Sequence, residues 1–341
     1  MNRSRAVTAY SAAHFAVDFA CCFFIFGRLS QAGYGCEAYL VYNFCAFALQ
    51  MAIGAAADKI NRNSSVLLAG CALVFFTYLL PLTLPNVMLC AILGVGNAMF
   101  HVGAGLDILN MSDGASYLGI FVSPGAFGLY LGKICARGVS VPHILVGSAP
   151  LLMGIVCYAV YYGGKGSAIS DNAPVMLCKL NPKLITAAVL FFAVVALRAY
   201  SGLTMTFEWN STAVYGLALT LALMLGKASG GIMADKFGAL RTSAVSLLLS
   251  CALFWLSDTP ICGILAVFLF NMTMPITLHR MCGIFKNAKG FAFGALTFAM
   301  YLGFLPAYFG VSAHGGAVYC VFAAVTLLFM LAGLKLEEGE R

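Results

Sequence analysis

Two long stretches of this chain contain no Asp, Glu, Lys or Arg, and they constrain the fold more than any other feature. The first runs from residue 63 to residue 106, and the second from residue 290 to residue 334. A helix that crosses a bilayer needs about 20 mostly apolar residues, so each stretch is long enough to cross twice. Turn-forming residues interrupt them, at 81–86 and at 314–316. The two stretches therefore predict two membrane-embedded helical hairpins.

Further apolar runs bring the predicted number of membrane spans to twelve. These runs cover approximately residues 6–27, 35–57, 115–135, 142–163, 183–207, 211–233, 240–257 and 259–282. The runs are long and their apolar residues do not alternate with polar ones, which favours helices over strands. The first run contains His14 and Asp18 and no small-residue cleavage site, so we expect a mature span there. The sequence predicts an all-α membrane protein.

The composition excludes a soluble enzyme. Of the 341 residues, 62% are hydrophobic and 9% are charged, whereas a soluble domain carries roughly 25% charged residues to cover its surface. The net charge of +7 fits basic cytoplasmic loops and does not require a nucleic-acid partner. The 13 cysteines include no C-x-x-C pair, so we interpret them as packing residues. The sequence predicts no metal site and no cofactor.

The basic residues predict the orientation of the spans. With the N-terminus inside, most Lys and Arg fall in cytoplasmic segments, and only Arg28, Lys133 and Arg137 fall in external ones. This is the bias of the positive-inside rule, so we expect both termini in the cytoplasm. The longest connection follows the sixth span and is typical of a linker between halves. The predicted domains are an N-terminal six-helix bundle at 1–164, a cytoplasmic linker at 165–182 and a C-terminal six-helix bundle at 183–341.

A short motif occurs twice, after the second and after the eighth predicted span. It reads Gly54-Ala-Ala-Ala-Asp58-Lys59 and then Gly231-Ile-Met-Ala-Asp235-Lys236. Glycine lets two helices approach closely, and an acid can meet a helix N-terminus. The repeat predicts an internal duplication and contacts that close the cytoplasmic side. The predicted gating residues are Gly54, Asp58, Lys59, Arg62, Asp107, Gly231, Asp235, Lys236 and Arg241, with Asp107 expected to pair with Lys59 or Arg62.

With this repeat, the whole chain resembles the major facilitator superfamily, which carries the same Gly, Asp and basic pattern between helices 2 and 3 and again between helices 8 and 9. The resemblance implies two pseudo-symmetric six-helix bundles and transport by alternating access. A narrower resemblance, to the fosmidomycin-resistance branch, rests on three segments. They are His14-Phe-Ala-Val-Asp18, Gly94-Val-Gly-Asn97-Ala-Met-Phe-His101, and Leu197-Arg198 with Gly202-Leu203.

The fifth predicted span is similar to the glycine-rich helix 5 of antiporters in this superfamily. Its glycines include Gly125, Gly128 and Gly132. The segment departs from the family pattern at Lys133, where related exporters often have Pro, which puts the direction of transport in question. Close helix packing without antiport is an equally good explanation of the glycines.

Four polar residues fall within about one helical turn of the predicted bilayer centre, namely Asp18, Asn97, Arg198 and Asn271. An ionised side chain there costs at least ~2.5–3.5 kcal/mol, so it must face water, a partner or a substrate. His14 lies four residues before Asp18, and His101 lies four residues after Asn97, so each pair shares a helix face. We therefore expect these side chains to line an internal cavity.

Each of these residues has a predicted role. Asp18 and His14 are titratable and are predicted to couple transport to protons. Arg198, with Asn97, His101 and Asn271, is predicted to bind substrate, and its planar fork favours an anionic or zwitterionic compound. Other interpretations remain open: Asp18 could form a permanent ion pair with His14 or Arg198, and His101 could be a hydrogen-bonded core residue.

Together these features predict a secondary active transporter in the cell membrane that acts as a monomer and exports a small organic compound by proton antiport. The chain has no G-x-x-x-x-G-K-[ST] phosphate loop for ATP hydrolysis. The main alternatives are a proton-coupled uptake carrier for a small organic anion and a transport-inactive membrane scaffold, and sodium could replace the proton. A membrane-embedded lipid enzyme is disfavoured, because the five His are dispersed along the chain.

Overall fold

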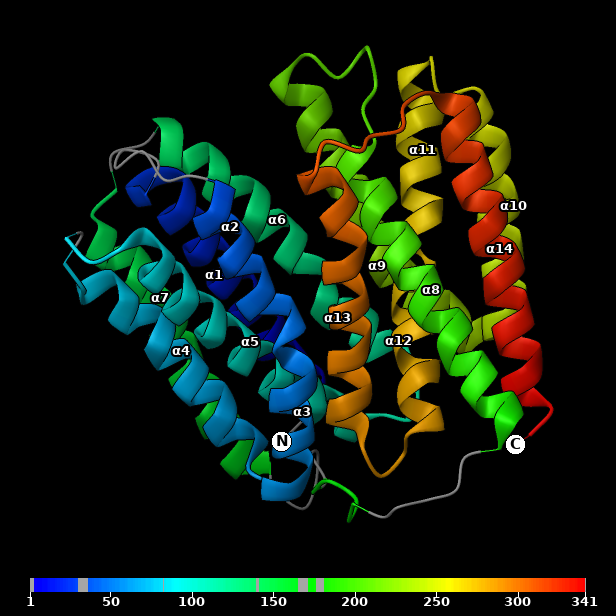
Figure 1. Cartoon of the computed structure of the whole chain (residues 1–341). Helices are drawn as coiled ribbons and strands as arrows, with labels where there is room; N and C mark the ends of the chain where they lie inside the picture. The colour runs from blue at the N-terminus through cyan, green and yellow to red at the C-terminus, as the bar shows by residue number, and fades with distance from the viewer. Residues whose placement is uncertain are drawn as a thin grey trace. The chain divides into compact units, whose positions relative to one another are not determined.

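The computed structural model describes residues 3–29, 36–81, 83–138, 141–164, 171–175 and 181–340 (Figure 1). Every regular element in these ranges is a helix. The elements are α1 (Arg3–Phe23), η1 (Phe24–Leu29), α2 (Cys36–Asn43), η3 (Phe44–Ala48), α3 (Gln50–Ile60), α4 (Asn63–Leu79), α5 (Asn86–Met111), α6 (Ser116–Gly138), α7 (His143–Gly164), α8 (Pro182–Thr204), α9 (Ala213–Phe237), α10 (Ala239–Trp255), α11 (Pro260–Asn271), α12 (Thr273–Ile284), α13 (Lys289–Tyr308) and α14 (Gly316–Glu338). Most of the predicted linker, including Lys165 and Lys179, lies outside the described residues.

The lengths of the helices identify an integral, multi-pass membrane protein. Among the described residues, 10 helical segments are long and apolar enough to cross a bilayer. Two shorter apolar helices, α4 and α10, have 17 residues each, which is the lower end of the range of about 17–25 residues that span a bilayer. They lie where the sequence predicts the third and ninth spans. The prediction of an all-α membrane protein is confirmed.

The chain forms two compact units. Unit 1 comprises Met1–Asp113, Pro124–Val175 and Asn287–Thr297. Within it, α5 packs against α4, α1 and the segments α2, η3 and α3, while α7 packs against α4 and α1. Glycines on the facing sides of α4 and α5 make the closest of these contacts possible. A Cβ on Gly96 would lie 2.9 Å from the Gly70 carbonyl oxygen, so neither helix tolerates a larger residue there.

Unit 2 comprises Gly114–Ser123, Met176–Lys286 and Phe298–Arg341. Its helices pack in the same order as those of unit 1. The pairs α10–α11, α10–α14 and α8–α14 correspond to α4–α5, α4–α7 and α1–α7, and α9 packs against α11 and α12 as the second span of unit 1 packs against α5. This repetition is what the duplicated glycine–aspartate motif predicts.

One span of unit 2 is broken in the middle. The segment Pro260–Ile284 is a single candidate span, but α11 ends at Asn271 and α12 begins at Thr273. Pro275 explains the break, because proline lacks a backbone N–H and its ring clashes with the carbonyl four residues before it, here that of Asn271. Broken helices at membrane depth are tolerated where they are buried in protein or line a cavity.

Candidate functional site

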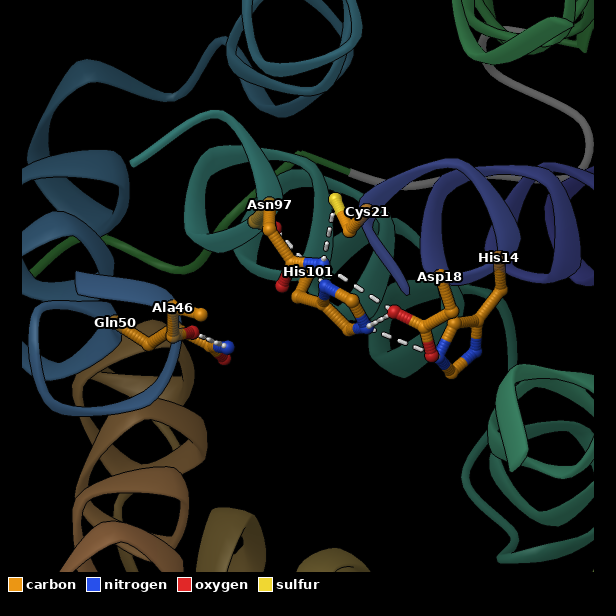
Figure 2. A network of polar contacts seen from close by, with 7 residues as sticks. All are labelled: His14, Asp18, Cys21, Ala46, Gln50, Asn97 and His101. Atoms are coloured by element: carbon orange, nitrogen blue, oxygen red, sulfur yellow. Dashed lines mark hydrogen bonds and ion pairs between the residues drawn. The ribbon is translucent and has the colours of Figure 1, made fainter. Parts of the chain in front are cut away.

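The polar residues predicted on the first and fourth spans meet in one cluster of unit 1 (Figure 2). His14 and Asp18 lie on consecutive turns of α1, and His14 Nε2 is 3.2 Å from Asp18 Oδ2. From α5, Asn97 donates its side-chain amide to Asp18 Oδ1 at 3.3 Å, and His101 Nε2 lies 2.9 Å from His14 Nε2. His14, Asp18 and Asn97 are buried. The cluster is therefore held by two helices and shielded from solvent.

The hydrogen bonds show how the cluster can hold a proton. His101 Nδ1 lies 2.9 Å from the Asn97 carbonyl oxygen, which only accepts, so Nδ1 is the protonated nitrogen. A neutral His101 then accepts at Nε2, and His14 Nε2–H donates to it or to Asp18. If His101 takes up a second proton, its Nε2–H can point to Asp18 Oδ1, 3.7 Å away. The three side chains can thus exchange one proton without a large movement.

Gly125 leaves the space that this cluster occupies. A Cβ at Gly125 would lie 2.5 Å from Asp18 Oδ2 and would also overlap His14 Nε2. Along the same helix, a Cβ on Gly128 or Gly132 would lie 2.5 Å from a backbone carbonyl oxygen of α1. The glycines of α6 therefore allow close packing on α1, and Gly125 in addition borders the titratable side chains.

The same three side chains meet the simplest requirement of a metal site. Ligand atoms of His14, Asp18 and His101 all lie within 4.8 Å of one another. Two imidazole nitrogens on a tetrahedral zinc ion would be about 3.3 Å apart, since each Zn–N bond is about 2.0–2.1 Å. The observed separation of 2.9 Å is a hydrogen-bond distance. As arranged, these residues form a hydrogen-bonded network.

In unit 2, Arg198 and Asn271 stand apart from any such network. Arg198 lies on α8 with 9% of its surface exposed, and its Nη1 makes no hydrogen bond. No carboxylate of unit 2 forms an ion pair with it in the part of the chain that the structure describes. Asn271 lies at the break after α11, and its side-chain amide donates to the Val267 carbonyl at 2.8 Å. Arg198 therefore has hydrogen-bonding capacity left for another group.

The first copy of the repeated motif caps a helix within unit 1. Asp58, in the last turn of α3, accepts hydrogen bonds from the backbone N–H groups of Gly290 at 2.8 Å and Phe291 at 2.9 Å. These groups belong to the first turn of α13, where an acid is stabilised by the free N–H groups and the helix dipole. Gly54, one turn earlier, faces the Gly290 backbone so closely that no Cβ fits.

The second copy makes the same contact within unit 2. Asp235 accepts from the backbone N–H groups of Ala115 and Ser116, both at 2.8 Å, and from the Ser116 hydroxyl. These residues begin α6. A Cβ on Gly231 would lie 3.1 Å from Ser116 Cα and closer still to the Ala115 carbonyl. Each motif thus uses its glycine for close approach and its aspartate as a helix cap.

The remaining predicted gating residues behave differently. Lys59, Arg62, Lys236 and Arg241 are exposed, and within the described ranges none of them forms an ion pair with an acid. Asp107 is fully buried and accepts a hydrogen bond from the Tyr10 hydroxyl at 2.6 Å. The expected pairing of Asp107 with Lys59 or Arg62 is therefore wrong, because Asp107 faces the interior of the bundle.

Sequence reasoning did not single out three of the residues at these sites. Tyr10 lies one turn before His14 on the same face of α1, a spacing that could have identified it. Gln50 is fully buried, with its amide donated to the Ala46 carbonyl at 2.6 Å and its Oε1 without a hydrogen bond (Figure 2). Lys289 donates to the Leu109 carbonyl at 3.2 Å and to the Asn110 side chain at 3.0 Å.

Comparison with known proteins places the fold. No protein-family model matches the sequence, and no curated protein matches it significantly. Among solved structures, the human organic anion transporter MFSD10 (TETRAN) is similar with a TM-score of 0.69 and 13% identity, over 98% of this chain and 100% of that one. The E. coli fucose:proton symporter FucP is similar with a TM-score of 0.66 and 12% identity, over 97% and 98% of the two chains. A second FucP structure, described as a major facilitator superfamily transporter, gives 0.64 and 14%, over 95% and 97%.

Proposed function

We propose that this protein is a secondary active transporter that moves a small organic solute across the cell membrane by alternating access and couples that movement to protons. Its fold is similar to that of major facilitator superfamily transporters over nearly its full length. The observation that carries the proposal is the buried cluster of His14, Asp18 and His101, whose side chains can share a proton at membrane depth. A permanently charged ion pair would not need a second histidine.

The cluster is the proton site of this proposal. A buried charge at membrane depth must be paired or neutralised, and Asp18 has two imidazoles within reach to do either. His101, which the sequence assigned to substrate binding, belongs to the proton site because it contacts His14. Asn97 supports Asp18 through its amide.

Arg198 is the proposed contact for an anionic or zwitterionic substrate. It is buried, and one of its guanidinium nitrogens makes no hydrogen bond. A guanidinium binds carboxylate, phosphate or phosphonate in a planar, two-pronged arrangement. Asn271, at the break between α11 and α12, offers a second polar group in the same unit. MFSD10 is described as an organic anion transporter, which agrees with this substrate class.

The two helix-capping aspartates are the proposed gates on the cytoplasmic side. Asp58 and Asp235 each bind backbone N–H groups that must be released when the helices separate. The basic residues that follow them, Lys59 and Lys236, are exposed, as the positive-inside rule expects of cytoplasmic loops. We further propose export by antiport, following the resemblance to the fosmidomycin-resistance branch, and function as a monomer. Uptake by symport is the second candidate, because FucP is a fucose:proton symporter.

A ligand screen followed by a transport assay tests the proposal. Purified protein is heated with organic acids, phosphonates and common antibiotics, and a ligand raises the apparent stability by about 2.7 kcal/mol at one hundred times its Kd. The strongest ligand is then followed in proteoliposomes under pH gradients of both signs. Accumulation against the ligand's gradient, in a direction set by the pH gradient, is expected. A ligand flux that does not change with the pH gradient would contradict proton coupling. A flux that depends on a sodium gradient would identify sodium as the coupling ion.

A further inference from the structure

A third pair of polar residues, Tyr10 and Asp107, extends the proton cluster along the same two helices. Asp18 meets Asn97, His14 meets His101, and Tyr10 meets Asp107. The residue numbers rise on α1 as they fall on α5, so the two helices run antiparallel and the three pairs form successive rungs. Tyr10 precedes His14 by one turn, about 6 Å along the helix axis. Of the three pairs, Tyr10–Asp107 lies nearest the N-terminal end of α1.

Asp107 lacks the partners that an ionised carboxylate requires. Its Oδ2 accepts from the Tyr10 hydroxyl, whereas Oδ1 is buried and makes no hydrogen bond. No Lys, Arg or His forms an ion pair with it in the described part of the chain. An ionised carboxylate would thus be buried without a counter-ion, and a bound proton removes that cost. The prediction of a gating ion pair at Asp107 has no support in these contacts.

Several polar side chains lie near Asp107, on the side of the cluster that faces the exposed residue Asp171. On α1 Asp107 faces Tyr10, and on α4 it faces the side chain of Asn63. On α7, Cys157 and Tyr161 lie within electrostatic range of it. Tyr161 in turn donates its hydroxyl to Asp171 Oδ1 at 3.4 Å. Asp171 is exposed in the segment that follows the sixth span. Ionisable and hydroxyl groups therefore lie between the buried Tyr10–Asp107 pair and an exposed carboxylate.

We propose that Asp107 is a second protonation site, which receives protons from the His14–Asp18–His101 cluster and releases them to the cytoplasm past Tyr161 and Asp171. The proposal rests on the proton coupling proposed above. Transfer from the His14–His101 pair to the Tyr10–Asp107 pair, one turn of α1 away, requires bridging water. As the N–H bond of the protonated histidine breaks, an O–H bond forms on Asp107 Oδ1, and loss of that proton to cytoplasmic water resets the carboxylate. Tyr10 keeps its own proton and positions Oδ2.

Infrared difference spectroscopy tests the site without requiring a known substrate. The full chain is reconstituted in phosphatidylethanolamine–phosphatidylglycerol liposomes, and spectra are recorded as the pH is lowered. We expect two carboxyl C=O bands from buried acids, one removed by Asp18→Asn and the other by Asp107→Asn. The matched control Asp258→Asn changes an exposed acid and should leave both bands in place. A spectrum that Asp107→Asn does not change would overturn the proposal.

Proton movement provides the functional arm of the test. The fluorescence of pyranine enclosed in the vesicles reports the internal pH during transport. The transported anion is the organic anion that gives the largest proton flux with the wild-type protein. In Asp107→Asn, proton movement is expected to slow by at least about tenfold, whereas exchange of labelled anion at equal pH is unchanged. Asp107→Glu should restore proton movement, and Tyr10→Phe should shift its pH profile.

The outcomes separate the two proposals. If Asp18→Asn abolishes proton flux and Asp107→Asn does not, the relay is wrong and proton coupling stands. If neither variant changes the proton flux of the wild type, the His14–Asp18–His101 cluster is not the proton site, and the relay is wrong with it. If Asp107→Asn loses anion exchange together with proton flux, Asp107 has only a structural role.

Discussion

The helices α1 of unit 1 and α8 of unit 2 correspond in their packing, but they carry side chains of opposite charge. In unit 1, α1 carries Asp18, whose two oxygens contact two histidines and an asparagine. In unit 2, the corresponding helix α8 carries Arg198, whose Nη1 makes no hydrogen bond. Both carboxylate oxygens of Asp18 in unit 1 have polar partners, whereas Arg198 in unit 2 has one guanidinium nitrogen that makes no hydrogen bond. The two units thus share their helix packing but carry different polar side chains, which the proposed function assigns to proton exchange in unit 1 and to anion binding in unit 2.

Asp18→Asn is expected to break this division most severely. An amide cannot exchange a proton with His14 or His101, so flux driven by a pH gradient should fall to the level of protein-free liposomes. Exchange of labelled substrate at equal pH should continue, because Arg198 and its unit are unchanged. Both activities are measured in proteoliposomes. Equal loss of the two would indicate that Asp18 forms a structural ion pair.

Arg198→Lys tests the other unit. Lysine keeps the charge but loses the planar fork, and a hydrogen bond to a charged group contributes about 1.5–3 kcal/mol. The affinity for an anionic substrate should therefore fall about tenfold or more, while proton binding to the unit 1 cluster is unaffected. Thermal-shift titration measures this affinity. An unchanged Kd would remove Arg198 from the substrate site.

Gly125→Ala sharpens the comparison by crowding only the proton cluster. The added methyl group would lie 2.5 Å from Asp18 Oδ2, and overpacking of this kind typically costs about 1–3 kcal/mol. A lower thermal midpoint and weaker proton coupling are expected. Gly202→Ala is the matched control in α8 of unit 2, because a Cβ there meets nothing within 4 Å. Equal stability of both variants would show that the cluster is not closely packed.

The smallest changes in stability are expected at the helix-capping aspartate that both units contain. Asp58→Asn and Asp235→Asn each replace a charged helix cap by a neutral one, and the interaction of an acid with a helix N-terminus is worth about 0.3–1 kcal/mol. We expect similar, small losses of unfolding free energy from both, measured by thermal denaturation. A loss confined to one variant would show that the repeated motifs are not equivalent.

Part of the site could be predicted because it depends on local spacing. His14 with Asp18, and Asn97 with His101, are four residues apart, and the helical repeat places each pair on one face. Glycine and aspartate in the repeated motif likewise predicted close approach and a helix cap. The partner of each cap was not predictable, since Asp58 and the first turn of α13 are far apart in the sequence.

The sequence by itself determined the class of the molecule, because apolar length, the scarcity of charge and the basic loops are properties of the chain that the bilayer selects directly. Only the tertiary structure decided that His101 contacts His14 and that Asp107 faces Tyr10 in place of Lys59 or Arg62. Those contacts depend on which faces of distant helices pack together. That choice follows from side-chain shape along whole interfaces, which the spacing of residues within one helix does not specify.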